Sequence, residues 1–181
     1  GSQLAIPSLL MNPTRARLLD ILTQMGLRIS VAQLEEIHGE MVGTLQVEGG
    51  TLKGITIAGA DSAALIDEIP VLAAIAPYSE QGIEVRDAKE LRVKESDRIA
   101  AVATNLRLMG AQLEEREDGF RIPGGQTLHG AELDSFGDHR IAMAFAVAAL
   151  RASSEVTIRG AESAAISYPA FFQALEEVTE R

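Results

Sequence analysis

Apolar and polar positions repeat with the helical period in three segments of the chain. We predict amphipathic helices over residues 13–26, 95–110 and 168–181. The first two helices close on Met-Gly, and glycine is the residue favoured just past a helix end. Their glycines, Gly26 and Gly110, lie 84 positions apart. The pattern therefore indicates an internal repeat.

Short alternating segments precede these helices and are interpreted as strands, at residues 3–7, 82–88 and 155–161. Two Ala-rich segments, 61–81 and 136–152, are apolar nearly all round, which is typical of helices buried at the centre of a fold. Short polar β segments follow the first two amphipathic helices. We therefore predict an α/β fold of about three repeated β-α-β-α units, with incomplete end copies, one shared core and amphipathic helices covering the sheets.

Composition is that of an ordinary globular protein with few aromatic residues. Of the 181 residues, 46% are apolar and only 4% aromatic, so Ala, Leu, Ile and Val must fill the core. The chain lacks a Pro- or Ser-rich linker, so we expect one domain over residues 3–181 and interpret residues 1–2 as a cloning scar. No apolar run reaches the roughly 18 residues of a membrane span, and the start lacks signal-peptide character. We expect a cytoplasmic protein.

The charge and residue inventory argues against several classes of function. The net charge is −10, whereas general nucleic-acid binding needs a basic face to neutralise phosphates. Without cysteine there are no disulfides, thiolate metal sites or cysteine nucleophiles. The three histidines, His38, His129 and His139, are too scattered for a recognisable metal site. A small anionic substrate fits, provided that basic residues gather locally.

One group of charges lies inside the apolar segment 61–81, where Asp67 and Glu68 precede Pro70. A buried carboxylate costs several kcal/mol unless it is paired or protonated. Two interpretations fit this pattern. In the first, the helix is kinked at the proline and the carboxylates reach solvent. In the second, a carboxylate is held in a partly dry site and serves as a general base.

A second group opens the other Ala-rich helix, in the motif GDHR at residues 137–140. Asp138 is a reasonable N-cap, which places His139 and Arg140 in the first turn, where the helix dipole slightly disfavours cations. Free backbone N–H groups together with Arg and His suit an anion such as phosphate or carboxylate. The alternative is an ion pair between Asp138 and Arg140 at an exposed cap.

A third group, RVKESDRI at residues 92–99, places five formal charges at the start of a helix. Glu95, Ser96 or Asp97 could each be the N-cap, and a solvated cap is the simpler interpretation of this stretch alone. Three helix starts with clustered charges in one chain are harder to explain as caps. If the repeated units stack side by side, we expect all three starts to converge on one rim of the domain.

The motifs ELRVKESDRI, FGDHRIAMAFAVAAL, ALIDEIPVLA and ISYPAFFQAL, in this order and spacing, resemble the C-terminal half of the 5-enolpyruvylshikimate-3-phosphate synthase family. The segment MNPTRARLLDILTQMG fits the same family, and the resemblance runs from about residue 3 to the end. The resemblance implies an inside-out α/β barrel domain, with buried parallel helices and outer sheets in three repeated units. This agrees with the repeat seen in the apolar pattern.

The resemblance also implies an enzyme of the shikimate pathway of aromatic amino acid biosynthesis. It would transfer the enolpyruvyl group of phosphoenolpyruvate to the 5-hydroxyl of shikimate 3-phosphate and release phosphate, with no metal or organic cofactor. By motif, Asp67 resembles the carboxylate that accepts the hydroxyl proton. Glu95 resembles the group that handles the proton at C3 of phosphoenolpyruvate.

The remaining site residues implied by the resemblance bind substrate. Lys94 resembles a residue that contacts shikimate phosphate near the reacting hydroxyl. Arg98 and Arg140 resemble the guanidiniums that hold the carboxylate and phosphate of phosphoenolpyruvate, and His139 would lie beside the same anion. Several negative charges on the substrates, together with a proton to transfer, would account for the charges crowded into RVKESDR.

Two positions and the length depart from the family. Some members carry Asn at the position of Glu90 and Lys at the position of Ile166, so roles for these residues are not assigned. The family is roughly twice as long, and its N-terminal domain, which supplies most of the shikimate-phosphate pocket and closes over the site, is absent. One strand would then be missing, which would leave an unpaired edge or an exposed apolar patch.

These observations leave three hypotheses. The first is a catalytic half of the synthase that is nearly inactive until it meets its partner domain. The second is a non-catalytic scaffold of the same fold. The third is half of a UDP-N-acetylglucosamine enolpyruvyl transferase, which shares the fold but not these motifs.

Overall fold

The computed structural model describes residues 2–12 and 16–179, and its order of elements repeats along the chain. The first repeat holds β1 (Gln3–Leu10), α1 (Arg17–Gln24), β2 (Arg28–Ile37), β3 (Glu40–Glu48), β4 (Ile55–Ile57), α2 (Ala60–Ala64) and α3 (Ile69–Ile75), followed by the short helix η1 (Ala76–Tyr78). The second holds β5 (Ile83–Val85), η2 (Lys89–Val93), α4 (Arg98–Leu108), β6 (Glu114–Arg116), β7 (Gly119–Ile122), β8 (Glu132–Asp134) and α5 (His139–Ala149). A third begins with β9 (Thr157–Arg159), η3 (Ala161–Ile166) and α6 (Phe171–Thr179). The predicted repeat is therefore present.

Parallel strand pairs join one repeat to the next. In the sheet of order β4-β5-β7-β6, β4 of the first repeat pairs in parallel with β5 of the second, whereas β5, β7 and β6 are antiparallel. In the two-stranded sheet, β8 of the second repeat pairs in parallel with β9 of the third. The remaining sheet, β1-β3-β2, is antiparallel. The repeats thus share sheets as well as a core.

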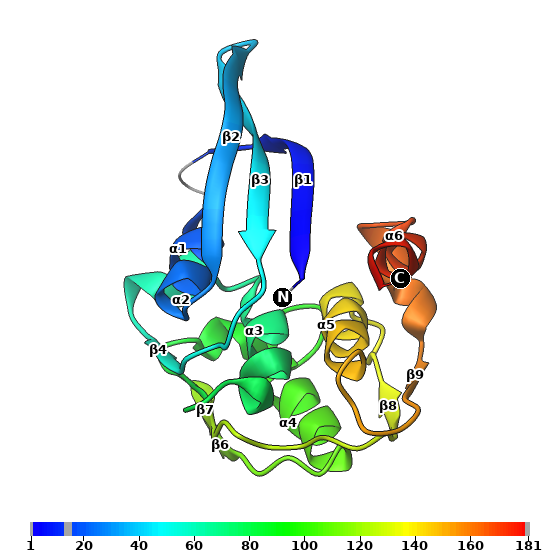
Figure 1. Cartoon of the computed structure of the whole chain (residues 1–181). Helices are drawn as coiled ribbons and strands as arrows, with labels where there is room; N and C mark the ends of the chain where they lie inside the picture. The colour runs from blue at the N-terminus through cyan, green and yellow to red at the C-terminus, as the bar shows by residue number, and fades with distance from the viewer. Residues whose placement is uncertain (1, 13–15, 180–181) are drawn as a thin grey trace.

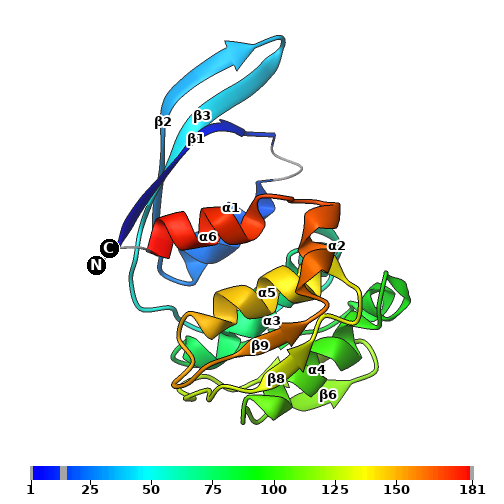
Figure 2. The same ribbon diagram turned by 90° about the vertical axis from the view of Figure 1, so that its right-hand side faces the viewer.

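Three helices, α3, α4 and α5, form the centre of the core, with the sheets outside them (Figures 1 and 2). The Ala-rich helices α3 and α5 are buried as predicted, with Leu72 and Phe145 fully inaccessible. The prediction that α4 covers a sheet was incomplete, because α4 lies in the core as well. Its polar Asn105 does not mark a solvent face: the buried amide bonds both backbone groups of Asp134 in β8.

The helix predicted over residues 61–81 is divided into α2, α3 and η1, with a turn over residues 65–68. Pro70 lies in the first turn of α3, where its missing N–H costs nothing because those N–H groups have no partner within the helix. The break places Asp67 in the turn immediately before α3 rather than inside a helix.

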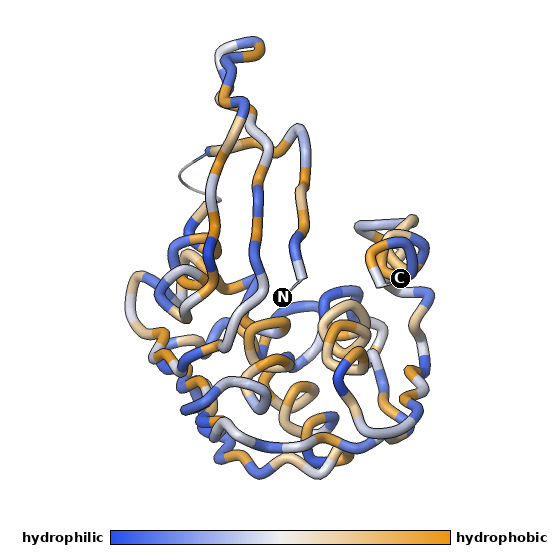
Figure 3. The backbone as a smooth tube through the Cα atoms, viewed as in Figure 1, coloured by the Kyte–Doolittle hydropathy of each residue, from blue (hydrophilic) through white to orange (hydrophobic). Residues whose placement is uncertain are grey.

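The antiparallel sheet β1-β3-β2 projects from the helical core, and α6 lies apart from the sheet's strands (Figure 1). Both β1 and β2 carry apolar residues (Figure 3), yet both strands are mostly exposed. Exposed large apolar side chains on this sheet and α6 include Leu4, Ile6, Leu10, Val31, Leu34, Ile37, Met41, Phe172 and Val178. Among the described residues, β1 pairs on one edge only. The expected open edge and apolar surface are therefore present.

Within the described residues, no helix has the length and apolar character needed to cross a membrane.

Two leucines of α4 test this description of the core. Leu106 is fully buried and Leu108 is 47% exposed, so Leu106→Ala should lower the free energy of unfolding by about 2–5 kcal/mol and Leu108→Ala by less than about 0.5 kcal/mol. Urea denaturation of both variants measures the difference. Equal losses would contradict the placement of α4 in the core.

Candidate active site at three helix starts

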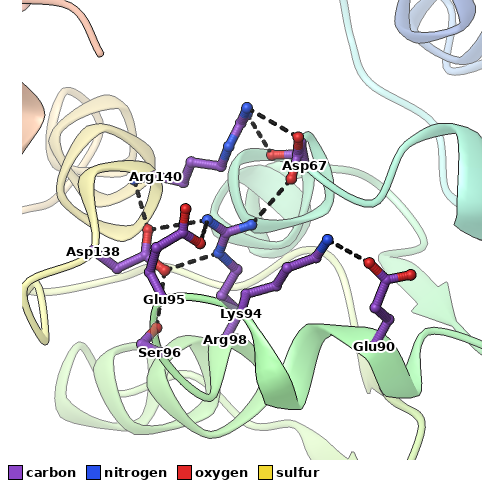
Figure 4. Close-up of polar contacts among 8 residues, drawn as sticks. All are labelled: Asp67, Glu90, Lys94, Glu95, Ser96, Arg98, Asp138 and Arg140. Atoms are coloured by element: carbon purple, nitrogen blue, oxygen red, sulfur yellow. Dashed lines mark hydrogen bonds and ion pairs between the residues drawn. The ribbon is translucent and has the colours of Figure 1, made fainter. Parts of the chain in front are cut away.

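Charged side chains from the starts of α3, α4 and α5 meet around the guanidinium of Arg98 (Figure 4). Asp67 comes from the turn before α3, Glu95 from the segment before α4, and Asp138 from the position just before α5. The prediction that the three starts converge is confirmed by these contacts. Four of the six residues proposed from the sequence, Asp67, Glu95, Arg98 and Arg140, belong to this network.

Arg98 donates hydrogen bonds to three carboxylates. Its Nε lies 2.8 Å from Oδ2 of Asp138, and its Nη2 lies 3.3 Å from Oδ1 of the same residue. Nη2 also lies 2.6 Å from Oε2 of Glu95, and Nη1 lies 3.2 Å from Oδ1 of Asp67. One cation therefore ties together the starts of three helices.

The residues at the centre of the network are buried, and those at its rim are partly exposed to solvent. The side chains of Arg98 and Asp138 are 1% and 0% exposed, whereas those of Asp67 and Glu95 are 33% and 53% exposed. Burial alone would raise the pKa of Asp138, but hydrogen bonds from Arg98 and from the backbone N–H of Arg140 outweigh it and lower this pKa. Burial alone would likewise lower the pKa of Arg98, and Asp138 reverses this effect. Both groups are therefore charged at neutral pH.

Arg140 reaches the same network from α5. Its Nη2 lies 3.2 Å from Oδ2 of Asp67, and its Nη1 donates to the backbone carbonyl of Asp67 at 2.9 Å. The carboxylate of Asp67 thus bridges Arg98 and Arg140. The structure has a feature of each interpretation of Asp67: the helix breaks near the proline, and the carboxylate is paired and only one-third exposed.

The structure shows which residues cap α4 and α5, and so decides between the interpretations that the motifs left open. Asp97 is the N-cap of α4: its side chain accepts from the backbone N–H of Ala100 at 3.0 Å and pairs with Arg92. Asp138 caps α5 by accepting from the backbone N–H of Arg140 at 2.9 Å. The alternative of an exposed ion pair between Asp138 and Arg140 is wrong, since Asp138 is fully buried and its ion pair is with Arg98.

Two proposed binding residues lie outside the Arg98 network. The ammonium of Lys94 pairs with Glu90 on the preceding turn, which also gives Glu90 a contact that the sequence did not assign. His139 is the first residue of α5 and half-buried, and in the described part of the chain its ring has no hydrogen-bond partner. Ile166 ends η3 and is 73% exposed.

Sequence reasoning missed the part that Asp138 and Ser96 play in this site. Ser96 Oγ donates to Oδ2 of Asp138 at 3.0 Å, so the segment before α4 holds the same carboxylate that Arg98 holds. A usable signal was present: Arg98 falls among apolar residues on a buried helix, and a buried cation needs a buried counter-charge.

A cavity of about 180 Å³ opens beside Asp67 and Arg140, lined by apolar residues of α3 and α5 and by Phe171 of α6. Guanidiniums beside partly exposed carboxylates can bind a small anion and exchange a proton with it. In the described parts of the chain, no group of three His, Asp or Glu side chains is arranged to hold a metal ion.

Known proteins resemble the chain over almost all of its length. Residues 1–175 match the model of the family described as EPSP synthase (3-phosphoshikimate 1-carboxyvinyltransferase). Relatives named 3-phosphoshikimate 1-carboxyvinyltransferase from Koribacter versatilis and Solibacter usitatus are 58% and 52% identical, over 99% of this chain and 42% of their own length. An EPSP synthase structure from Acinetobacter baumannii superposes with a TM-score of 0.91 at 37% identity, over 98% of this chain and 42% of that one.

The chain thus spans about two fifths of the length of the relatives it matches. Its fold is that of the matching part of the EPSP synthase structure, with buried central helices and outer sheets in repeated units. On the family match, the identities and the superposed structure together, this chain belongs to the EPSP synthase (3-phosphoshikimate 1-carboxyvinyltransferase) family.

Proposed function

We propose that this chain carries one side of the active site of a 3-phosphoshikimate 1-carboxyvinyltransferase. The reaction would join the 5-hydroxyl oxygen of shikimate 3-phosphate to C2 of phosphoenolpyruvate and release phosphate. The observation that carries the proposal is the single network of Asp67, Glu95, Arg98 and Arg140 in a chain whose relatives bear that name.

Two carboxylates would handle the protons. Addition moves the hydroxyl proton to a base, which we assign to Asp67, while C3 of phosphoenolpyruvate gains a proton, which we assign to Glu95. Elimination then breaks the C2–O bond to phosphate while C3 returns a proton to Glu95, and the leaving phosphate takes the proton from Asp67, so the atoms balance. Both carboxylates are partly exposed and lie next to Arg98, which suits groups that must reach a substrate.

The cations would hold the anionic groups of the substrates. We assign Arg98, Arg140 and His139 to phosphoenolpyruvate and Lys94 to shikimate 3-phosphate. Without substrate, Arg98 and Arg140 are paired with Asp67, and Lys94 is paired with Glu90. Substrate anions would therefore replace these carboxylates on the cations, which also releases Asp67 to accept a proton.

The rest of the site would come from the part of the relatives that this chain does not cover. We propose that residues 3–181 form one C-terminal-type domain, that an N-terminal domain completes the pocket and closes over it, and that the whole acts in the cytoplasm without a cofactor. The exposed apolar side chains of β1, β2 and α6 support a missing neighbour, because soluble proteins rarely leave such surfaces uncovered.

Reconstitution tests the proposal. The chain alone, given phosphoenolpyruvate and shikimate 3-phosphate, should release phosphate no faster than the background, because the closed, water-free cleft is incomplete. Mixing it with the separately expressed part of the Koribacter versatilis relative that it does not cover should restore release by at least 100-fold, on the order of one catalytic group. A confirmed complex that stays inactive would support a scaffold instead, and activity with UDP-N-acetylglucosamine would support the other transferase.

Glu95 tests the assignment of the proton-handling groups. In the reconstituted protein, Glu95→Gln should lower kcat by about 10²–10⁴-fold, since the amide cannot transfer the C3 proton. Glu117→Gln is the matched control, because Glu117 is 77% exposed and, among the residues that the structure describes, forms an ion pair only with Lys89. Steady-state phosphate release measures both variants. Equal kcat values for the two variants would remove Glu95 from the mechanism.

A further inference from the structure

We propose that Asp138 is a positioning residue of this site: it is the permanent counter-ion of Arg98 and fixes which edge of the guanidinium faces the substrate. The inference rests on the proposed function. It assigns a second role to a residue that the sequence identified only as a helix cap.

The geometry around Arg98 separates two edges of the guanidinium. Asp138 receives the Nε–H and one Nη2–H, and so occupies the edge nearest the side-chain stem, at 2.8 and 3.3 Å. The outer edge, formed by Nη1 and the other Nη2–H, faces Asp67 and Glu95. A carboxylate or phosphate of a substrate can therefore bind the outer edge in the bidentate manner that arginine favours, without disturbing Asp138.

Exposure distinguishes the permanent partner from the exchangeable ones. Asp67 and Glu95 are 33% and 53% exposed, so each has room to move off Arg98 when an anion takes its place. Asp138 is 0% exposed, and leaving Arg98 would strand a charge in the interior. Only Asp138 can therefore hold Arg98 before and after substrate binds.

The backbone before α5 holds Asp138 in one position. Phe136 and Gly137 both have left-handed backbone angles, with φ of 53° and 70°, and such a conformation is strained for a bulky residue like Phe136. Hydrogen bonds from the residues on both sides of this pair hold the left-handed conformation. The N–H of Asp138 donates to the carbonyl of Ser135 at 2.9 Å, and Ser135 Oγ donates to the carbonyl of Gly160 at 3.0 Å.

Asparagine at this position separates positioning from capping. Asn is as good an N-cap as Asp, so Asp138→Asn keeps the start of α5 but removes the charge and one of the two acceptors that Arg98 uses. Asp97→Asn is the matched control. Asp97 caps α4 in the same way, and among the described residues its carboxylate pairs with Arg92 and not with Arg98.

The first experiment follows the Nε–H of Arg98 by NMR of the wild-type chain, with the signal assigned by its absence in Arg98→Lys. The wild-type signal should exchange slowly with solvent, Asp138→Asn should speed the exchange at least tenfold, and Asp97→Asn should leave it within twofold. If Asp138→Asn fails to fold, Ser96→Ala removes one hydrogen bond from the same Oδ2 atom and should still speed exchange severalfold. Unchanged exchange in the folded variant, or equal acceleration by Asp97→Asn, overturns the proposal.

The second experiment measures steady-state kinetics in the reconstituted protein. Asp138→Asn should raise KM for phosphoenolpyruvate on the order of 10- to 100-fold, the effect of one hydrogen bond to a charged group, and KM for shikimate 3-phosphate by less than threefold. Equal rises in both KM values, or none, overturn the positioning role. If the wild-type mixture does not release phosphate, the proposed function fails, while the NMR result still decides whether Asp138 positions Arg98.

Discussion

The fold and the site both depend on one buried cation. Arg98 lies in the interior at the point where α3, α4 and α5 begin, and its guanidinium bonds a carboxylate from each of the three starts. Replacing a buried ion pair by apolar residues is often neutral or stabilising, so such a pair is weak evidence of a purely structural role. The anion-binding role that we propose for the outer edge of Arg98 would explain why the charge is kept inside the core.

The repeat explains how three helix starts come to one place. Because β4 pairs in parallel with β5, and β8 with β9, successive repeats continue in the same direction. The starts of α3 and α5, which are equivalent in the repeat, meet at Arg98 at the start of α4. Helix starts favour anions and disfavour cations, so the arginines there require nearby carboxylates while no substrate is bound. The same arrangement would suit the substrates that we propose, which carry phosphate and carboxylate groups.

Periodicity and motif predicted the repeat, the buried Ala-rich helices and the meeting of Asp67, Glu95, Arg98 and Arg140. They could not predict features that depend on contacts between distant segments. The polar Asn105 on α4 is buried because its amide bonds the backbone of Asp134, 29 positions later in the chain. The burial of Asp138 was hidden for the same reason, since its partner Arg98 lies 40 positions earlier in the chain. The local sequence pattern gives the type of each residue, but not which distant group forms its hydrogen bond or ion pair.

The stability of Arg98→Met tests the central claim most directly, with Arg107→Met as its control, because Arg107 lies on the same helix with a 49% exposed side chain. At pH 7, urea denaturation should show a loss of about 3–5 kcal/mol for Arg98→Met, which strands Asp138, and of less than about 1 kcal/mol for Arg107→Met. Arg98 lowers the pKa of Asp138 in the folded protein, so the stability from this pair is present above the ordinary pKa of 3.8 and fades as the pH falls below it. The difference between wild type and Arg98→Met should therefore narrow in acid. Equal stability of the two variants at pH 7 would contradict the account.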